Sequence, residues 1–353
     1  MANVNIRKPR FYVDLINYAM SRGTVQNNNY DVLPDGSDLI GTFTTGSEAE
    51  LFDMRPLNQV SWDTHSTTVK RQDHVLVNID SESGAWEHNF IAILNHNKAS
   101  AQAKFRIGAS GTEAHINNKD FAHASTYSIN PTVKLNANVN GSAPYEVTPI
   151  LNGSTIVTFS NSSLRYWGIQ FEGIADVGND GDGDHFDLNN DLKIGCIMFG
   201  QYYDMPNSPD LSVKRSIAFD AVNTQESLGG QRYATMTNFG KKASSDNKSP
   251  FNTNSNRWGS HGGRMSYDMK FSYLASTDVM PDDYAGIDRD DDAVIEDVWN
   301  MTNGRHLPFV FTTDGTSTAE SDYLFARFGQ DSFNMTQVAP DVFDVSMKIE
   351  EEF

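Results

Sequence analysis

Val342-Phe-Asp-Val-Ser-Met-Lys-Ile-Glu-Glu-Glu-Phe353 ends the chain with apolar side chains at alternate positions. Alternation with a period of two is typical of a strand that buries one face. A terminal strand of this kind is held in a sheet and does not fray. The last third of the chain is therefore predicted to be a strand-rich assembly unit that ends in a packed acidic strand, and no catalytic motif accompanies it.

Two elements are expected upstream of this strand. Ser266–Leu274 alternates regularly, which places Tyr267, Met269, Phe271 and Tyr273 on one face that should meet a core. Asp290–Trp299 has acidic residues at its start, where the helix dipole favours them, and apolar residues four apart. It predicts a helix that Gly304 ends.

The rest of the chain also favours β structure. A length of 353 residues makes two or three domains the natural expectation. Hydrophobic residues make up 38% and charged residues 21%, and short apolar runs are separated by clusters of turn-forming residues. This pattern predicts an antiparallel β-sandwich. Its expected strands are 75–79, 90–94, 103–107, 155–159, 166–171 and 192–199.

Three segments are expected from changes in composition. Residues 1–40 are predicted to be an extended N-terminal arm, within which Phe11–Met20 fits either a short helix ending near Gly23 or a strand. Residues 41–204 are expected to form the sandwich. Two prolines in Met205–Leu211 then mark a boundary, after which residues 205–353 form a second β domain.

The charge of the chain limits its partners. Forty-six acidic residues against 27 basic ones give a formal net charge of −19, so a phosphate-binding surface is not expected and nucleic acid is excluded as a partner. Such a charge favours solubility and either cations or basic partner surfaces, and it is equally typical of a protein from a salty environment, which is the interpretation we favour. Cys196 lies in an apolar run and is predicted to be a small buried hydrophobe. No apolar stretch approaches the ~20 residues of a membrane span, so membrane insertion is not expected.

An acidic segment, Asp176–Asp191, is the strongest local motif. Its aspartates alternate with glycines and follow the spacing of a calcium-binding loop, although His185 stands where the loop's sharp turn needs glycine. The flanking residues predict strands, so the alternative is a solvated acidic loop between two strands. The candidate calcium ligands are Asp180, Asp182, Asp184 and Asp191.

Catalytic motifs are not found. The sequence has no nucleophile elbow, no phosphate-binding glycine loop with lysine and no cysteine beside an activating histidine, and the spacing of its histidines matches no zinc site. With 46 acids, no glycosidase pair can be chosen from sequence. A non-enzymatic role is expected, and Trp86 and Trp258 are the candidate glycan-stacking residues because both lie in turn-like surroundings.

Several segments together carry a family resemblance. Asn89–Asn97, Lys193–Gly200, Asp204–Leu211, Leu307–Phe311 and Ser346–Glu350 resemble framework segments of uncharacterised virion structural proteins of marine tailed phages. The resemblance begins near residue 60 and spans most of the remaining chain.

This resemblance implies a jelly-roll or galactose-binding-like sandwich followed by a smaller β domain similar to tail-tube and distal-tail proteins. It implies a tail or tail-tip protein that assembles as a symmetric oligomer in the host cytoplasm and functions in the virion. The partners would be copies of the chain, other virion proteins and a host surface glycan. Arg7, Lys8 and Arg10 would let the arm reach a neighbouring acidic surface. The alternatives are a carbohydrate-binding receptor adhesin, a capsid decoration protein and a glycan hydrolase.

Overall fold

The computed structural model describes most of the chain: residues 6–23, 30–35, 39–64, 74–82, 86–174, 185–187, 189–218, 222–236, 250–251, 264–280 and 293–352. The chain forms two units. Unit 1 comprises residues 1–11, 203–317 and 321–353, and unit 2 comprises residues 12–202 and 318–320. The sequence places its boundaries at residues 40/41 and 204/205; the chain passes between the units at 11/12 and 202/203, and again at 317/318 and 320/321.

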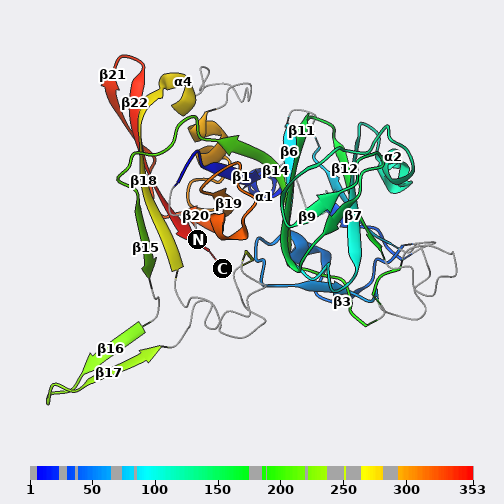
Figure 1. Ribbon diagram of the computed structural model, residues 1–353, viewed down its shortest axis with the longest axis horizontal. Coiled ribbons are helices and arrows are strands. Elements are labelled where there is room, and N and C mark those ends of the chain that lie inside the picture. Colours follow the sequence, from blue (N-terminus) through cyan, green and yellow to red (C-terminus); the bar gives the residue numbers. More distant parts are fainter. Residues whose placement is uncertain are drawn as a thin grey trace. The chain divides into compact units, whose positions relative to one another are not determined.

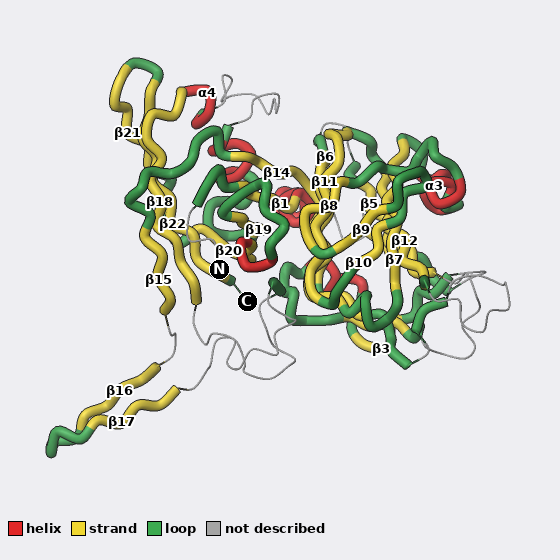
Figure 2. Tube along the Cα trace, in the orientation of Figure 1, coloured by secondary structure: helices red, strands yellow, loops and turns green. Residues whose placement is uncertain are grey.

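The fold is mainly β, with large antiparallel sheets and few helices, as the sequence predicts. Figure 2 shows that strands and loops make up most of the trace and that the helices are short. These helices are α1 (Leu15–Arg22), η1 (Glu48–Phe52), α2 (Glu113–Asn117), α3 (Asp120–His123), α4 (Ser276–Val279), η2 (Ile295–Asn300) and η3 (Glu320–Asp322).

Unit 2 contains a six-stranded antiparallel sheet in the order β2-β5-β12-β7-β10-β9. Its strands are β2 (Tyr30–Val32), β5 (His74–Asp80), β7 (Ala103–Ser110), β9 (Ala137–Val139), β10 (Val147–Pro149) and β12 (Tyr166–Gly173). Four further strands of unit 2 pair in the order β14-β6-β11-β8. They are β6 (His88–His96), β8 (Thr132–Leu135), β11 (Gly153–Ser162) and β14 (Cys196–Asp204).

The interior of unit 2 lies between these two sets of strands. Val77, Ile169 and Phe171 of the six-stranded sheet share one buried cluster with Ile91 and Phe199 of the other set. This arrangement is a β-sandwich whose facing side chains alternate along each strand. A small sheet in the order β13-β4-β3 completes unit 2; its strands are β3 (Phe43–Thr45), β4 (Val60–Trp62) and β13 (Lys193–Ile194). Cys196 is fully buried, as expected of a small hydrophobe.

The outer face of the six-stranded sheet is covered by α2 and α3. Leu76, Ile116 and Phe121 form a buried cluster there, separate from the sandwich interior. Gly108 makes this covering possible, because a Cβ at that position would lie 2.1 Å from the Cγ of Phe121. The two helices therefore pack closely against one part of the outer face of the sheet. The end of that face which they leave uncovered carries polar side chains.

The N-terminal segment differs from an extended arm. Strand β1 (Arg10–Asp14) is buried along its whole length, and α1 follows it directly. The Asp14 carboxylate caps α1 by accepting from the backbone N–H of Asn17 at 2.8 Å. Gly23 ends the helix in the left-handed conformation, with φ 71°. Both sequence interpretations apply to the segment, since it contains first a strand and then a helix.

The interior of unit 2 also contains a lysine. Lys98 has no exposed surface, and its Nζ lies 4.0 Å from the ring centroid of Phe105 and 4.9 Å from that of Phe171. No described residue gives this Nζ a hydrogen-bond partner. Burial lowers the pKa of Lys98 well below its usual value, because the interior disfavours the charged ammonium.

Unit 1 contains an antiparallel sheet in the order β15-β18-β22-β20, followed by β19, and β21 also pairs with β22. Its strands are β15 (Lys214–Ala218), β18 (Arg264–Ala275), β19 (Phe309–Thr312), β20 (Tyr323–Phe328), β21 (Asn334–Ala339) and β22 (Val342–Glu351). The terminal strand predicted from the sequence is therefore present, and Val345, Met347 and Ile349 are its buried residues.

The predicted face of β18 is interrupted. Tyr267, Met269 and Phe271 are buried as expected, but Tyr273 is 78% exposed. A register shift between Phe271 and Leu274 moves Leu274 into the buried position, and Tyr273 adopts φ 60°. The expectation for Tyr273 was wrong because a β-bulge reverses which side of a strand each later residue occupies.

The predicted acidic helix also differs in form. Residues 281–292 lie outside the described part, and Ile295–Asn300 is a π-helix. Ile295, Glu296, Asp297 and Val298 are all buried, a run of four that one face of an α-helix does not provide. The helix ends at Asn300 with Met301 as its C-cap, so the expectation that Gly304 ends it was wrong; Gly304 lies in the turns beyond it, with φ 65°, and its N–H donates to the Trp299 carbonyl at 2.8 Å.

Strands β16 (Val222–Glu226) and β17 (Arg232–Met236) form a separate hairpin (Figure 1). They pair with each other from Val222–Met236 to Glu226–Arg232. In the described part of the chain they pair with no other strand.

Candidate functional site

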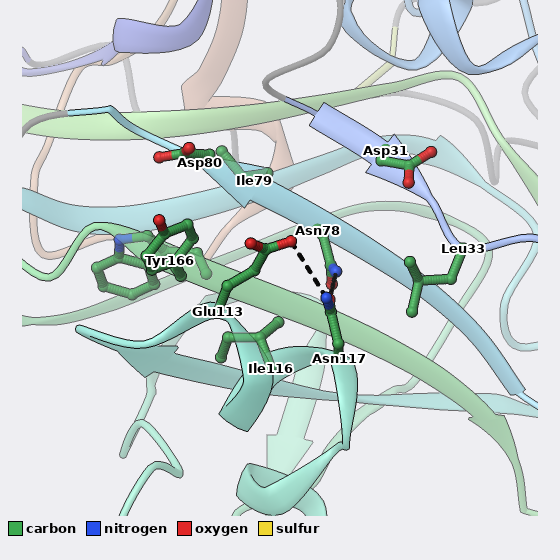
Figure 3. A pocket seen from close by; sticks show the side chains of 10 residues that line it. Asp31, Leu33, Asn78, Ile79, Asp80, Glu113, Ile116, Asn117 and Tyr166 are labelled. Atoms are coloured by element: carbon green, nitrogen blue, oxygen red, sulfur yellow. Dashed lines mark hydrogen bonds between the residues drawn. The ribbon is translucent and has the colours of Figure 1, made fainter.

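A polar pocket of about 290 Å³ lies on the outer face of the six-stranded sheet in unit 2 (Figure 3). Register explains its position: Asp80 lies opposite Tyr166, and Asn78 lies opposite Gly168, at the end of the face that α2 leaves open. The pocket is lined by Asp31, Leu33, Asn78, Ile79, Asp80, Glu113, Ile116, Asn117, Tyr166 and Trp167.

A hydrogen-bonded relay fixes the centre of the pocket. The Asn78 amide donates through Nδ2 to Oδ1 of Asn117, and Asn117 donates through Nδ2 to Oε1 of Glu113 at 3.2 Å. Figure 3 shows these three side chains side by side, with Asp31 and Leu33 toward one side and Asp80 and Tyr166 toward the other. The relay turns Oδ1 of Asn78 away from Asn117. This oxygen is buried and accepts from no described residue.

Asp80 has a structural role in the pocket wall. Its two carboxylate oxygens accept from Nε and Nη2 of Arg165 at 2.6 and 2.7 Å, and Oδ1 also accepts from the N–H of Glu82 at 2.8 Å. The Arg165 guanidinium lies 4.9 Å from the ring centroid of Tyr166. The paired Asp80 and Arg165 therefore hold Tyr166 against the edge of the pocket and cancel each other's charge.

The opposite side of the pocket is acidic. Asp31 is exposed on β2, and the neighbouring Glu48 accepts through Oε2 from the N–H of Val32 at 3.1 Å. Burial raises the pKa of Glu48, and the nearby Asp31 carboxylate raises it further. Asp31 and Glu113 therefore leave carboxylate oxygens at the pocket with no basic side chain among the lining residues.

The chemistry of the pocket follows from this lining. Its free groups are mainly hydrogen-bond acceptors, so a ligand that donates hydrogen bonds is favoured and an anion is repelled. Among the described residues, no three histidine, cysteine, aspartate or glutamate side chains lie close enough to hold a metal ion.

The candidate calcium ligands are only partly described. Asp180, Asp182 and Asp184 lie outside the described residues. Asp191 accepts through Oδ1 from the N–H of Thr64 at 3.1 Å, and its carbonyl oxygen accepts from Nδ2 of Asn97 at 2.7 Å. These bonds attach the end of the acidic segment to unit 2. The calcium site stays a prediction.

The candidate glycan-stacking residues do not line the pocket. Trp86 is half-buried, and its ring centroid lies 6.0 Å from that of Tyr18. Trp258 lies outside the described residues. Trp167 lines the pocket but is fully buried, as its position inside a strand indicates.

The basic residues of the predicted arm form contacts with other residues of unit 1. Arg10 is buried and forms a two-bond ion pair with Asp204, at 2.6 and 2.7 Å. Arg7 lies 3.5 Å from the carboxylate of Asp314. Lys8 is exposed, and its carbonyl accepts from the N–H of Gly315 at 3.0 Å. Arg10 is therefore an internal residue and is not presented to a neighbouring molecule.

A second candidate surface consists of exposed strands in unit 1. All five residues of β15 are exposed, and the strand pairs with β18 alone in the described part of the chain. Residues 223–235 of the hairpin are exposed as well. Leu228 at its tip is fully exposed, and Tyr233 is 54% exposed. These strands present main-chain groups and apolar side chains that no described residue covers.

Sequence reasoning missed the pocket because its residues come from four distant segments. The available signal was in β5, where Asn78 and Asp80 interrupt an otherwise apolar strand at alternate positions. Alternation places both side chains on the outer face. Which segments meet them there depends on strand pairing, which the sequence does not state.

Comparison with known proteins gives no further guide: no family model matches this sequence, and no curated protein matches it. In the described part of the chain, no helix is long and apolar enough to cross a membrane.

Proposed function

We propose that the protein is a non-enzymatic structural component of a tailed-phage virion, a tail or tail-tip protein that assembles as a symmetric oligomer. The observation that supports assembly is the β16–β17 hairpin, which has exposed side chains and no further strand partner in the described part of the chain. The phage assignment itself is supported by the resemblance of the sequence segments to virion proteins.

The energetics of the hairpin favour a partner. A two-stranded hairpin alone is marginally stable in water, because neither of its faces is buried. Leu228 and Tyr233 add apolar surface whose burial would contribute roughly 1.5–3 kcal/mol for each large side chain. A neighbouring copy that covers the hairpin would provide the missing burial.

The proposed occupant of these strands is a second copy of the chain. The edge of β15 that pairs with no described strand can accept a further strand through main-chain hydrogen bonds. Lys214 and Arg215 make this edge basic, whereas the chain as a whole has a net charge of −19. Contact between a basic edge and the acidic surface of an identical copy is electrostatically favourable and repeats around a ring.

Replacing residues 222–236 with a flexible linker tests the assembly role. Light scattering after gel filtration should show a defined oligomer for the intact protein and a monomer for the variant, with unchanged unfolding transitions for both units. Leu211→Ser provides a matched control, since Leu211 is equally exposed but lies outside the hairpin. An unchanged oligomer in the linker variant, or a monomeric intact protein at all concentrations, would contradict the proposal.

Immunogold labelling of purified phage particles tests the position in the virion. Label at the tail or its tip is expected. Label over the head would replace the tail assignment with capsid decoration, and particles without label would contradict the virion role.

A further inference from the structure

The pocket of unit 2 has no part in the assembly argument, and its chemistry is specific enough to indicate a ligand class. Two acidic side chains supply acceptors at it, Glu113 and Asp31. The hydrogen bond from Nδ2 of Asn117 to Oε1 of Glu113 holds that carboxylate in place before any ligand arrives. Preorganised acceptors of this kind favour a ligand with several hydroxyl donors in a fixed geometry.

Apolar surface accompanies these acceptors. Ile116 is buried beneath the pocket, while Leu33 and Tyr166 are half-buried at its two ends. A ligand that fits must therefore combine hydroxyl groups with an apolar face. A sugar ring has this combination, because its C–H groups form a face and its hydroxyls project around the edge.

Charge excludes other ligand classes. None of the described lining residues is basic, and the adjacent Arg165 is paired with Asp80, so the described part of the chain supplies no free cation for a phosphate, a sulfate or an acidic sugar. Metal binding is not supported among the described residues either, since no group of three suitable ligands is found. Neutral hydroxyl donors satisfy the acceptors without these difficulties.

Size limits the ligand further. A volume of about 290 Å³ lies just below the range for small-molecule pockets, roughly 300–1,000 Å³. It accommodates one ring, and the open side of the pocket leaves room for the rest of a chain.

We infer that this pocket binds a single neutral sugar ring, with Glu113 and Asp31 accepting from its hydroxyls and Tyr166 bordering its apolar face. The inference goes beyond the proposed structural role and does not depend on it. It places glycan recognition in unit 2 at residues other than Trp86 and Trp258.

Saturation-transfer NMR with the full-length protein tests this site. The probes are glucose, galactose, mannose, rhamnose and N-acetylglucosamine, with n-butylammonium as a cationic comparison. At least one sugar should give a saturable signal, and Glu113→Gln should weaken its binding about 10-fold, as expected for loss of a hydrogen bond to a charged group. Glu226→Gln makes the same change on the exposed hairpin and should have no effect.

A second variant separates loss of the site from loss of the fold. Tyr166→Ala removes the aromatic border and should also weaken binding, while circular dichroism confirms that each variant retains its unfolding transition. The absence of binding to every sugar, binding that Glu113→Gln leaves unchanged, or binding of the ammonium probe alone would each overturn the inference. Assembly is measured by light scattering, so a negative result here leaves the oligomer proposal to its own test.

Discussion

Strand β12 and the β16–β17 hairpin both consist of antiparallel pairing, yet they differ in what covers them. β12 pairs with β7 along its whole length and with β5 from Tyr166 to Glu172, and six of its eight residues are buried. The hairpin is fully paired internally, but its described side chains are exposed. Main-chain pairing is therefore common to both regions, and only burial of a face distinguishes them. Stability in this molecule should follow burial.

The largest effect is expected from shortening a buried side chain of β12. Phe171 is fully buried against Phe105 and Lys98, so Phe171→Ala should lower the free energy of unfolding of unit 2 by about 3–5 kcal/mol. Tyr233→Ala on the hairpin should cost less than about 0.5 kcal/mol in the monomer. Denaturant unfolding with hydrogen exchange assigned to each unit provides the measurement. Equal losses of stability in the two variants would contradict the conclusion that burial distinguishes β12 from the hairpin.

The next largest effect is expected on the pH dependence of stability, because the Asp14 carboxyl group is buried. Burial raises the pKa of Asp14 from 3.8 to about 6, against hydrogen bonds from Asn17 and Phe199 that lower it. The folded state therefore holds a proton that the unfolded state releases, and stability should fall by about 2 kcal/mol between pH 4 and pH 6. Asp14→Asn should remove this slope. Urea unfolding across that range checks the prediction; an unchanged slope in the variant would mean that another group causes it.

A smaller change in stability is expected from replacing Lys98. Because its pKa is lowered by burial, the unfolded state binds more protons than the folded state, and stability should rise with pH up to about 10. Lys98→Met should flatten this rise and stabilise unit 2 at pH 7 by about 1–2 kcal/mol, net of the lost contacts with Phe105 and Phe171. Thermal unfolding of both proteins at pH 7 and pH 9 tests this. A destabilised Lys98→Met protein would show that the amine has a favourable partner.

The strands could be predicted from sequence because their alternation is local. The runs at 75–79 and 166–171 and the terminal run from Val342 correspond to β5, β12 and β22. The exposed position of Tyr273 could not be predicted in the same way. A bulge depends on how two strands match, and the partner strand β22 is about 70 residues away in the chain.

The candidate site depends even more on long-range pairing. Asn78 and Glu113 meet only because β5 pairs with β12 and α2 crosses the outer face of the sheet. The aromatic and acidic residues that stand out in the sequence, Trp258 and Asp182, lie in segments outside the described part.

The place of β22 in its sheet has a consequence for biosynthesis. This strand pairs with β18, β20 and β21, yet it is the last of them to leave the ribosome. The strands of the sandwich are complete by residue 204, about 150 residues earlier. At roughly 5–20 residues per second, unit 2 has on the order of 10–30 s to fold before unit 1 receives its central strand. Until then β18 and β20 have free edges, and a chaperone that shields them would act on this half of the nascent chain.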